Sequence, residues 1–245
     1  RLCERFASDQ TRNLAEQIRM AAGQAVVMIA APSPVAQTKS PVFMDRAACL
    51  EFAVGRIGKV LGGEFAHVDA YPTRVRLPAE PLMLVDRILA VSGTPNSMKA
   101  GHCVTEHDVL AGGWYLDGGR IPTCIAVEAG QADLFLCGYL GIDAQTKGRA
   151  VYRLLDAVVT FHDHLPVPGD VIRYDITIDG FGRHDDIWLF FFRFEGTVNG
   201  KPLITMRKGS AGFFSAAELA KGRGIILTEA EQISVPGKRP ADWKP

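Results

Sequence analysis

The chain has 245 residues, of which 47% are hydrophobic and 22% charged, a composition typical of an ordinary globular protein with one large domain. Its 27 basic side chains balance its 27 acidic ones, which argues against a partner of nucleic acid or anionic membrane. No stretch approaches the roughly 18 apolar residues that a transmembrane helix needs, so no membrane partner is predicted.

The flanks of the chain differ in composition from its centre. Residues 1–44 contain an amphipathic helical stretch and then a linker-like segment, APSPVAQTKSP. Residues 45–73 predict a helical lead-in, with Asp45 as its N-cap and glycines at its end. Residues 216–245 predict an exit helix and a second linker. Because the first residues lack both an initiator Met and a signal-peptide layout, we expect a piece cut from a longer polypeptide.

The main pattern occupies residues 74–215, where strands dominate. Apolar and polar residues alternate in VIRYDITID, as in a half-buried strand, and Asn199-Gly200 predicts a tight hairpin turn. Residues 123–140 predict one long helix that is apolar on nearly all sides and therefore buried. The predicted fold is α+β, an antiparallel sheet wrapped around that central helix, with about six strands near 83–91, 101–107, 152–162, 171–179, 187–198 and 201–214.

A single carboxylate, Glu128, interrupts the apolar helix about a turn and a half after Pro122. A buried acid is costly to keep unless something uses it, and the helix dipole can act there on a bound carbonyl. Glu128 is therefore a candidate catalytic acid, and partial burial should raise its pKa. The alternative is a structural carboxylate that caps or bridges elements at a subunit interface.

The five cysteines are widely spaced and form no CxxC pair. This pattern favours reduced thiols and a cytoplasmic protein, and it argues against a zinc site or a disulfide framework. His162 and His164 occupy alternate positions like two metal ligands, but no third ligand is near in sequence, so a solvated turn is the better interpretation. No metal and no cofactor are predicted.

Several ordered segments resemble one known family. They are LPAEPLMLVDRI at 77–88, Trp114-Tyr115-Leu116, residues 122–131, the NGKPL hairpin and SAGFF. Together they resemble the hot-dog-fold 3-hydroxyacyl-thioester dehydratases, most closely the dehydratase-like domains of multidomain polyunsaturated fatty acid synthases. The resemblance covers roughly residues 74–215. It implies a hot-dog fold, an acyl chain carried by acyl carrier protein as substrate, and a second hot-dog unit as partner, in a homodimer or within one chain.

The resemblance also implies roles for particular residues. In the family an acid six residues after a Pro works with a His from another hot-dog unit, and that count from Pro122 leads to Glu128. The N–H groups of Thr123 and Cys124 would polarise the thioester carbonyl, and Trp114 would contact substrate. Gln131 shares a helix face with Glu128 and would orient it, although a solvated or core-bridging amide is an equal alternative.

The family's His has no counterpart here. It should follow the aromatic strand matched by Trp114-Tyr115-Leu116, where this chain has Asp117-Gly118-Gly119-Arg120. His107 is the nearest in sequence, but we expect it in a surface loop. His67, His102 and His184 belong to no recognisable group. Alternate aromatic residues in IWLFFFRF predict a buried strand that would line an acyl tunnel.

Three functions follow from these features. The first is a dehydratase domain that contributes its acid to a site shared with a second hot dog. The second is a non-catalytic hot dog that packs on an active one. The third is a hot-dog acyl thioesterase, because some members of the fold hydrolyse thioesters with a helix carboxylate and no His.

Overall fold

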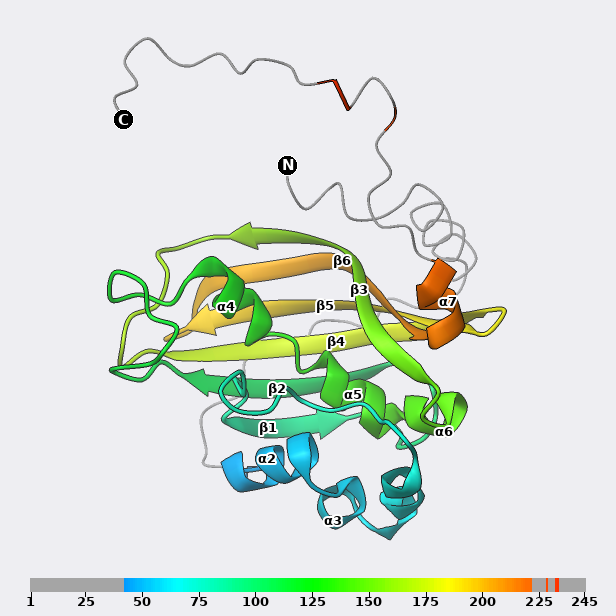
Figure 1. Ribbon diagram of the computed structural model, residues 1–245. Helices are drawn as coiled ribbons and strands as arrows, with labels where there is room; N and C mark the ends of the chain where they lie inside the picture. Colours follow the sequence, from blue (N-terminus) through cyan, green and yellow to red (C-terminus); the bar gives the residue numbers. More distant parts are fainter. Residues whose placement is uncertain (1–41, 222–227, 229–231, 234–245) are drawn as a thin grey trace.

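The computed structural model describes residues 42–221, 228, 232 and 233. In these residues six strands form one antiparallel sheet, in the order β1-β2-β4-β5-β6-β3. The helices α4 and α5 lie against one face of this curved sheet, and α2 and α3 lie beyond β1 (Figure 1). The arrangement is the predicted α+β hot-dog fold. The strands are β1 (Arg87–Ser92), β2 (Gly101–Asp108), β3 (Ala150–Phe161), β4 (Val171–His184), β5 (Ile187–Val198) and β6 (Lys201–Ser215).

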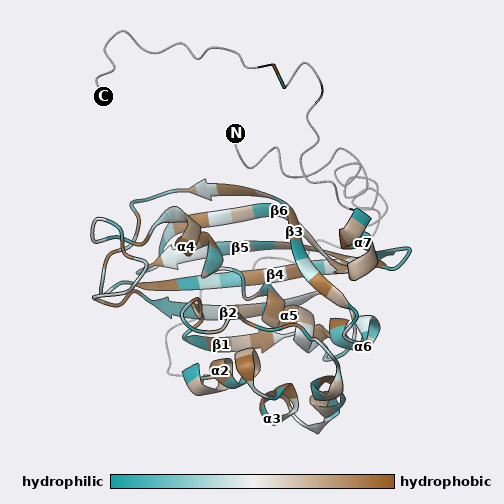
Figure 2. Cartoon of the chain, in the orientation of Figure 1, coloured by the Kyte–Doolittle hydropathy of each residue, from teal (hydrophilic) through white to brown (hydrophobic). Residues whose placement is uncertain are grey.

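The strands agree with the expected segments except at the first, where regular pairing begins only at Arg87. Alternation along β4 buries Ile172, Tyr174, Ile176 and Ile178, and the residues between them are exposed or partly exposed. Figure 2 shows the same change of hydropathy along the strands, and a mostly hydrophobic α5. The predicted Asn199-Gly200 turn joins β5 to β6, with both residues at positive φ, as a tight hairpin requires.

The central helix is broken, which contradicts the prediction of one helix over 123–140. It comprises α4 (Thr123–Glu128) and α5 (Asp133–Leu140). The hydroxyl of Tyr174 donates to the carbonyl of Ala126 at 2.5 Å and competes for the acceptor that Gly130 would use in a continuous helix. The N–H of Gly130 turns instead to the carbonyl of Val127. A β-carbon on Gly130 would lie 2.8 Å from the ring of Phe194, so the backbone meets the sheet closely at the break.

The helix α5 is the centre of the core. Phe135, Leu136, Cys137 and Leu140 are fully buried, and each apolar side chain of this size stabilises the fold by about 1.5–3 kcal/mol. The helix ends at Gly141, whose positive φ suits a left-handed C-cap. The chain continues through α6 (Ile142–Thr146) into β3, and α7 (Ala216–Lys221) follows β6.

The lead-in consists of α2 (Arg46–Val54), α3 (Ile57–Leu61) and the 3-10 helix η3 (Gly63–Ala70). The side chain of Asp45 accepts from the N–H of Ala48, which confirms the predicted cap. Phe52 packs edge-on against Phe135 at 5.4 Å between ring centroids, so α2 shares the core of the sheet. The predicted helix within 1–44 lies outside the described residues, and the domain limits stay a prediction. No helix in the described part of the chain is both long and apolar enough to span a membrane.

Candidate functional site

The entry to α4 presents free backbone donors. Pro122 is the N-cap in an extended conformation, with φ −73° and ψ 158°, and Thr123 and Cys124 are exposed in the first turn. The N–H groups of a first turn have no helical carbonyl to reach, and they carry the positive end of the dipole. Ile121 is fully buried, and its N–H donates to Pro166, which fixes where the helix begins. Two N–H groups can therefore point to a ligand carbonyl here.

Glu128 is the last residue of α4 and is partly buried. Burial raises the pKa of its carboxyl, as the sequence predicted. Gln131 lies in the segment between α4 and α5, and its Nε2 donates to Oε2 of Glu128 at 2.8 Å. The structure thus brings these two predicted residues together. A raised pKa favours the protonated form of a carboxyl, the form that can deliver a proton to a leaving group.

Tyr152 extends this contact to the sheet. Its hydroxyl donates to Oε1 of Gln131 at 3.2 Å, and its ring packs against Phe190 and Phe213. Tyr152 belongs to β3, so the chain Tyr152–Gln131–Glu128 joins an outer strand to the candidate acid. Sequence reasoning missed Tyr152, because nothing in the spacing of β3 and the helix indicates which strand residue faces the amide.

Asp133, the first residue of α5, is a second acid that sequence reasoning missed. It is fully buried, and neither carboxyl oxygen has a hydrogen-bond partner in the described residues. Burial raises its pKa to about 7, and the nearby charge of Glu128 adds to this rise. Its place five residues after Glu128 in an apolar helix was the signal that could have marked it.

Trp114 lies apart from these residues. The segment 114–116 forms turns and not the aromatic strand that the resemblance implied. The indole is 58% exposed, and its Nε1 donates to the carbonyl of Pro81 at 2.9 Å. This contact anchors the loop after β2 to the segment before β1, and a role of Trp114 toward substrate stays a prediction.

The turn at Asp117-Gly118-Gly119-Arg120 occupies the place of the family's His. The backbones of Asp117 and Arg120 pair with each other at 2.9 and 3.1 Å, and both glycines have positive φ. Two consecutive positive φ angles favour Gly over side-chain-bearing residues.

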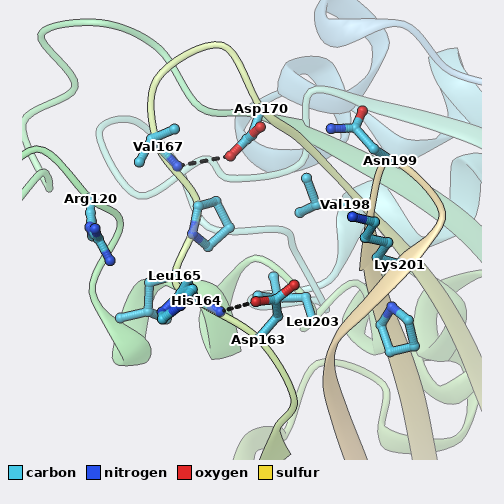
Figure 3. Close-up of a pocket in the computed structure, with 12 residues that line it drawn as sticks. Arg120, Asp163, His164, Leu165, Val167, Asp170, Val198, Asn199, Lys201 and Leu203 are labelled. Carbon is cyan, nitrogen blue, oxygen red and sulfur yellow. Dashed lines mark hydrogen bonds between the residues drawn. The ribbon is translucent and has the colours of Figure 1, made fainter.

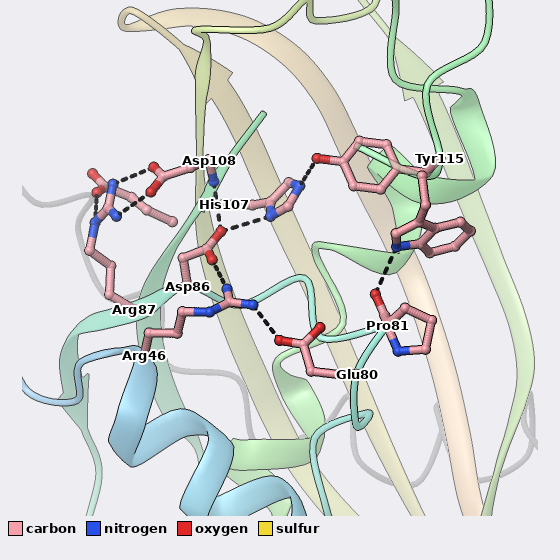
Figure 4. A network of polar contacts seen from close by, with 10 residues as sticks. Arg46, Glu80, Pro81, Asp86, Arg87, His107, Asp108 and Tyr115 are labelled. Carbon is pink, nitrogen blue, oxygen red and sulfur yellow. Dashed lines mark hydrogen bonds and ion pairs between the residues drawn. The ribbon is translucent and has the colours of Figure 1, made fainter. Parts of the chain in front are cut away.

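The surface-loop prediction for His107 is wrong. His107 lies in β2 and is buried, with 4% of its surface exposed. Its Nδ1 is 2.9 Å from Oδ2 of Asp86, and its Nε2 is 3.0 Å from the hydroxyl of Tyr115 (Figure 4). His107 falls on the inward face of its strand because the period of two continues from Cys103 through Thr105. The predicted strand ended at residue 107, where the end of a strand was mistaken for a loop.

Asp86 is the centre of this buried network. It pairs with Arg46, which also pairs with Glu80, and it accepts from the N–H of Asp108 at 2.8 Å (Figure 4). Burial raises the pKa of Asp86, but the hydrogen bonds from His107 and Asp108 outweigh burial and leave it below its usual value. Each member of the Asp86 network has a partner. Among the described residues, no hydrogen bond or ion pair joins any His to Glu128.

The remaining histidines make separate contacts. Nε2 of His162 is 3.0 Å from Oγ1 of Thr205, and His102 pairs with Asp175 at 2.7 Å on the exposed face of the sheet. His164 lies exposed in the turn after β3. Within the described ranges, no group of three or more His, Cys, Asp or Glu side chains is placed to hold a metal ion.

A pocket of about 310 Å³ lies between the turn before α4, the segment 163–170 and the β5–β6 hairpin (Figure 3). Arg120, His164 and Lys201 contribute positive or titratable groups. Asp163 and Asp170 face the same space, although one oxygen of each already accepts a backbone N–H. The charges nearly cancel, and none of the predicted site residues lines the pocket, so we do not assign the acid chemistry to it.

Comparison with known proteins connects the chain to one larger protein. It is 46% identical over 185 residues to a subunit of the polyunsaturated fatty acid synthase of Thraustochytrium sp. (strain ATCC 26185 / S-3). That match covers 74% of this chain but only 12% of the relative, so the chain spans about an eighth of that synthase polypeptide. No family model matches the chain.

Solved structures include similar chains at low identity. The dehydratase heterocomplex ApeI:P from Xenorhabdus doucetiae is 21% identical, with a TM-score of 0.44, and the match covers 60% of this chain and 93% of that one. The E. coli PaaI protein of the phenylacetic acid degradation operon is 16% identical, with a TM-score of 0.37, over 47% and 78% of the two chains. These likenesses are too slight to indicate an activity. The strand order and the helix against the sheet are those of the hot-dog fold, and the 46% identity relates the chain to a segment of a polyunsaturated fatty acid synthase subunit.

Proposed function

We propose that this chain supplies the acid half of a 3-hydroxyacyl-thioester dehydratase site, acting on an acyl chain carried by acyl carrier protein. The observation that carries the proposal is Glu128, a partly buried carboxyl with a raised pKa that accepts a hydrogen bond from Gln131. Glu128 ends the same short helix, α4, whose first turn presents the N–H groups of Thr123 and Cys124. The 46% identity to a segment of a polyunsaturated fatty acid synthase supports the choice of substrate class.

The reaction removes an α-proton and a 3-hydroxyl group from the thioester, leaving a double bond and water. The N–H groups of Thr123 and Cys124 would donate hydrogen bonds to the thioester carbonyl as negative charge develops on its oxygen. Glu128 would give its proton to the departing hydroxyl, which leaves as water. A base from a second hot dog would take the α-proton, and exchange with solvent would return both groups to their starting states.

The edge strand β3 is the surface that we propose for the second hot dog. The other edge, β1, is covered because Met44 exchanges two backbone hydrogen bonds with Ile88. β3 has a sheet neighbour on one side alone in the described residues, and it exposes Val151, Leu154 and Val158. A twelve-residue edge with exposed apolar side chains is a template for pairing with another strand.

A non-catalytic packing role is the second candidate, and one observation favours it. No His in the described residues is bonded to Glu128, and a glycine turn stands where the family has its His. In that case the second hot dog would hold a complete site, and the Glu128 carboxyl would be dispensable.

An assay of dehydration with the full-length protein tests these alternatives. The wild type and Glu128→Gln would be given a 3-hydroxyacyl thioester of acyl carrier protein, and the products separated by mass. We expect an enoyl thioester from the wild type, and a fall of about 10²-fold or more in kcat for the variant. Full activity in Glu128→Gln would support the packing role, and free acid with free thiol would indicate a thioesterase.

A further inference from the structure

We infer that Tyr152 is a positioning residue for Glu128. Tyr152 acts through the amide of Gln131 and so determines which carboxyl oxygen of Glu128 carries the proton. The inference rests on the proposed function, because it assigns a role in the delivery of that proton. It depends on two hydrogen bonds in series, from Tyr152 to Oε1 of Gln131 at 3.2 Å and from Nε2 of Gln131 to Oε2 of Glu128 at 2.8 Å.

The first hydrogen bond determines the orientation of the amide. A carboxamide has an acceptor end and a donor end, and the Tyr152 hydroxyl donates to the acceptor end. The donor end of Gln131 is therefore the end that faces Glu128. Without the hydroxyl, the amide loses a partner that distinguishes its two ends, and it can turn or move away from the acid.

The second hydrogen bond determines where the acid proton resides. Because Oε2 of Glu128 accepts from Gln131, a proton on that oxygen would face an N–H group. The protonated form of Glu128 therefore carries its hydrogen on Oε1, the oxygen that Gln131 leaves free. An acid that delivers a proton needs it on the atom that faces the leaving group, so this arrangement prepares the carboxyl before substrate binds.

Packing holds the Tyr152 hydroxyl in place. Tyr152 lies opposite Phe213 of β6, and its ring contacts both Phe213 and Phe190, with centroids 6.2 and 6.1 Å away. Burial raises the pKa of Tyr152 well above its usual range, so the hydroxyl stays a donor at all physiological pH values. Since β3 is also the proposed docking edge, the strand that meets the second hot dog is the strand that orients the acid.

Tyr152→Phe tests the inference in the full-length protein, because it removes the hydroxyl and keeps the ring. We expect kcat to fall about fivefold with little change in KM, the effect of one net hydrogen bond. The alkaline limb of the kcat–pH profile should move to higher pH, because Gln131 then stabilises the charged form of Glu128 less well. Tyr139→Phe is the matched control, since the Tyr139 hydroxyl contacts only the carbonyl of Gly93 in the described structure.

A double-mutant cycle isolates the route through the amide. Gln131→Met should reproduce the loss of Tyr152→Phe, and Tyr152→Phe should have no further effect in the Gln131→Met background. Additive losses would overturn the inference, and so would an unchanged pH profile in Tyr152→Phe.

A readout without catalysis separates this inference from the proposed function. The pKa of Glu128 can be followed by NMR of ¹³C-labelled glutamate, with Glu128→Gln identifying its signal. If Glu128→Gln keeps full activity, the dehydratase proposal fails. If Tyr152→Phe leaves the pKa of Glu128 unchanged, the positioning inference fails, whatever the result for Glu128→Gln.

Discussion

Two groups of polar side chains in this domain differ in how completely their hydrogen bonds are formed. In the Asp86 network, His107 has a partner on both ring nitrogens, and both oxygens of Asp86 are engaged. Around Glu128, the described residues provide no hydrogen-bond partner for the first-turn N–H groups of α4 or for either carboxyl oxygen of Asp133. A complete buried network stabilises a fold, whereas groups left unpaired near a titratable acid indicate a place for a ligand. The Asp86 network is the more complete of the two groups, and our proposal therefore places the chemistry at Glu128 and not at His107.

The largest expected effect comes from removing the central carboxylate of the Asp86 network. Asp86→Ala removes the acceptor used by His107, Arg46 and the N–H of Asp108, so the free energy of unfolding should fall by about 3–5 kcal/mol. Urea unfolding measures it, and Asp175→Ala is the matched control. Asp175 also contacts a His, at 2.7 Å, but on an exposed surface, where the loss should stay below about 1 kcal/mol.

The same variant tests the division of roles. At a temperature where Asp86→Ala remains folded, its kcat–pH profile should match that of the wild type, because in the described structure no member of the Asp86 network forms a hydrogen bond or ion pair with Glu128. A profile that moves with Asp86→Ala would show that His107 takes part in the chemistry, and the comparison between the two groups would then be wrong.

The fold was predictable because its signals are local. Period-two alternation, the Asn199-Gly200 turn and the Asp45 cap each depend on a few neighbouring residues, and the structure confirms them. The helix break was not predictable, because the hydroxyl that contacts it belongs to Tyr174, which is 48 residues away from Ala126 in the sequence. Helical periodicity alone carries no information about a hydrogen bond that comes from the sheet.

The candidate site, like the fold, could be predicted only where its contacts join residues that are near in the sequence. Glu128 and Gln131 lie three residues apart in the sequence, and a backbone turn from the Gln131 N–H to the Glu128 carbonyl keeps their side chains together although α4 ends at Glu128. Tyr152 and Asp86 are brought to their partners by strand order and register, which single-sequence patterns do not specify. His107 shows the difference most clearly, since it was the last residue of the predicted strand, and the period of two already placed it on the inward face with Cys103 and Thr105.

The free N–H groups at α4 provide the next test. Thr123→Pro removes the N–H of Thr123 but suits the first position of a helix, and the extended Pro122 before it is compatible with a following Pro. We expect kcat to fall about 10²–10³-fold if this N–H binds the developing oxyanion. Thr123→Ala keeps the N–H and should retain activity within about twofold. Equal activity in the two variants would remove the α4 entry from the proposed site.

The smallest expected effect concerns Asp133, and it is a pH dependence of the free energy of unfolding that can be measured without substrate. Burial raises its pKa from 3.8 to about 7, so between these values the folded protein holds a proton that the unfolded chain has already lost. The free energy of unfolding should therefore decrease as the pH rises through this window and level off above it. For this residue alone the decrease between pH 5 and pH 7 is about 2 kcal/mol.

Asp133→Asn stays neutral at every pH, so the fall in stability between pH 5 and pH 7 should be smaller than in the wild type by that amount. Asp163→Asn, an exposed acid in the turn after β3, is the control and should leave the slope unchanged. Equal slopes in wild type and Asp133→Asn would mean that Asp133 is solvated or paired in solution. The carboxyl of Asp133 would then have hydrogen-bond partners, as the members of the Asp86 network do. The only remaining difference between the two regions in the described residues would be the free N–H groups of α4.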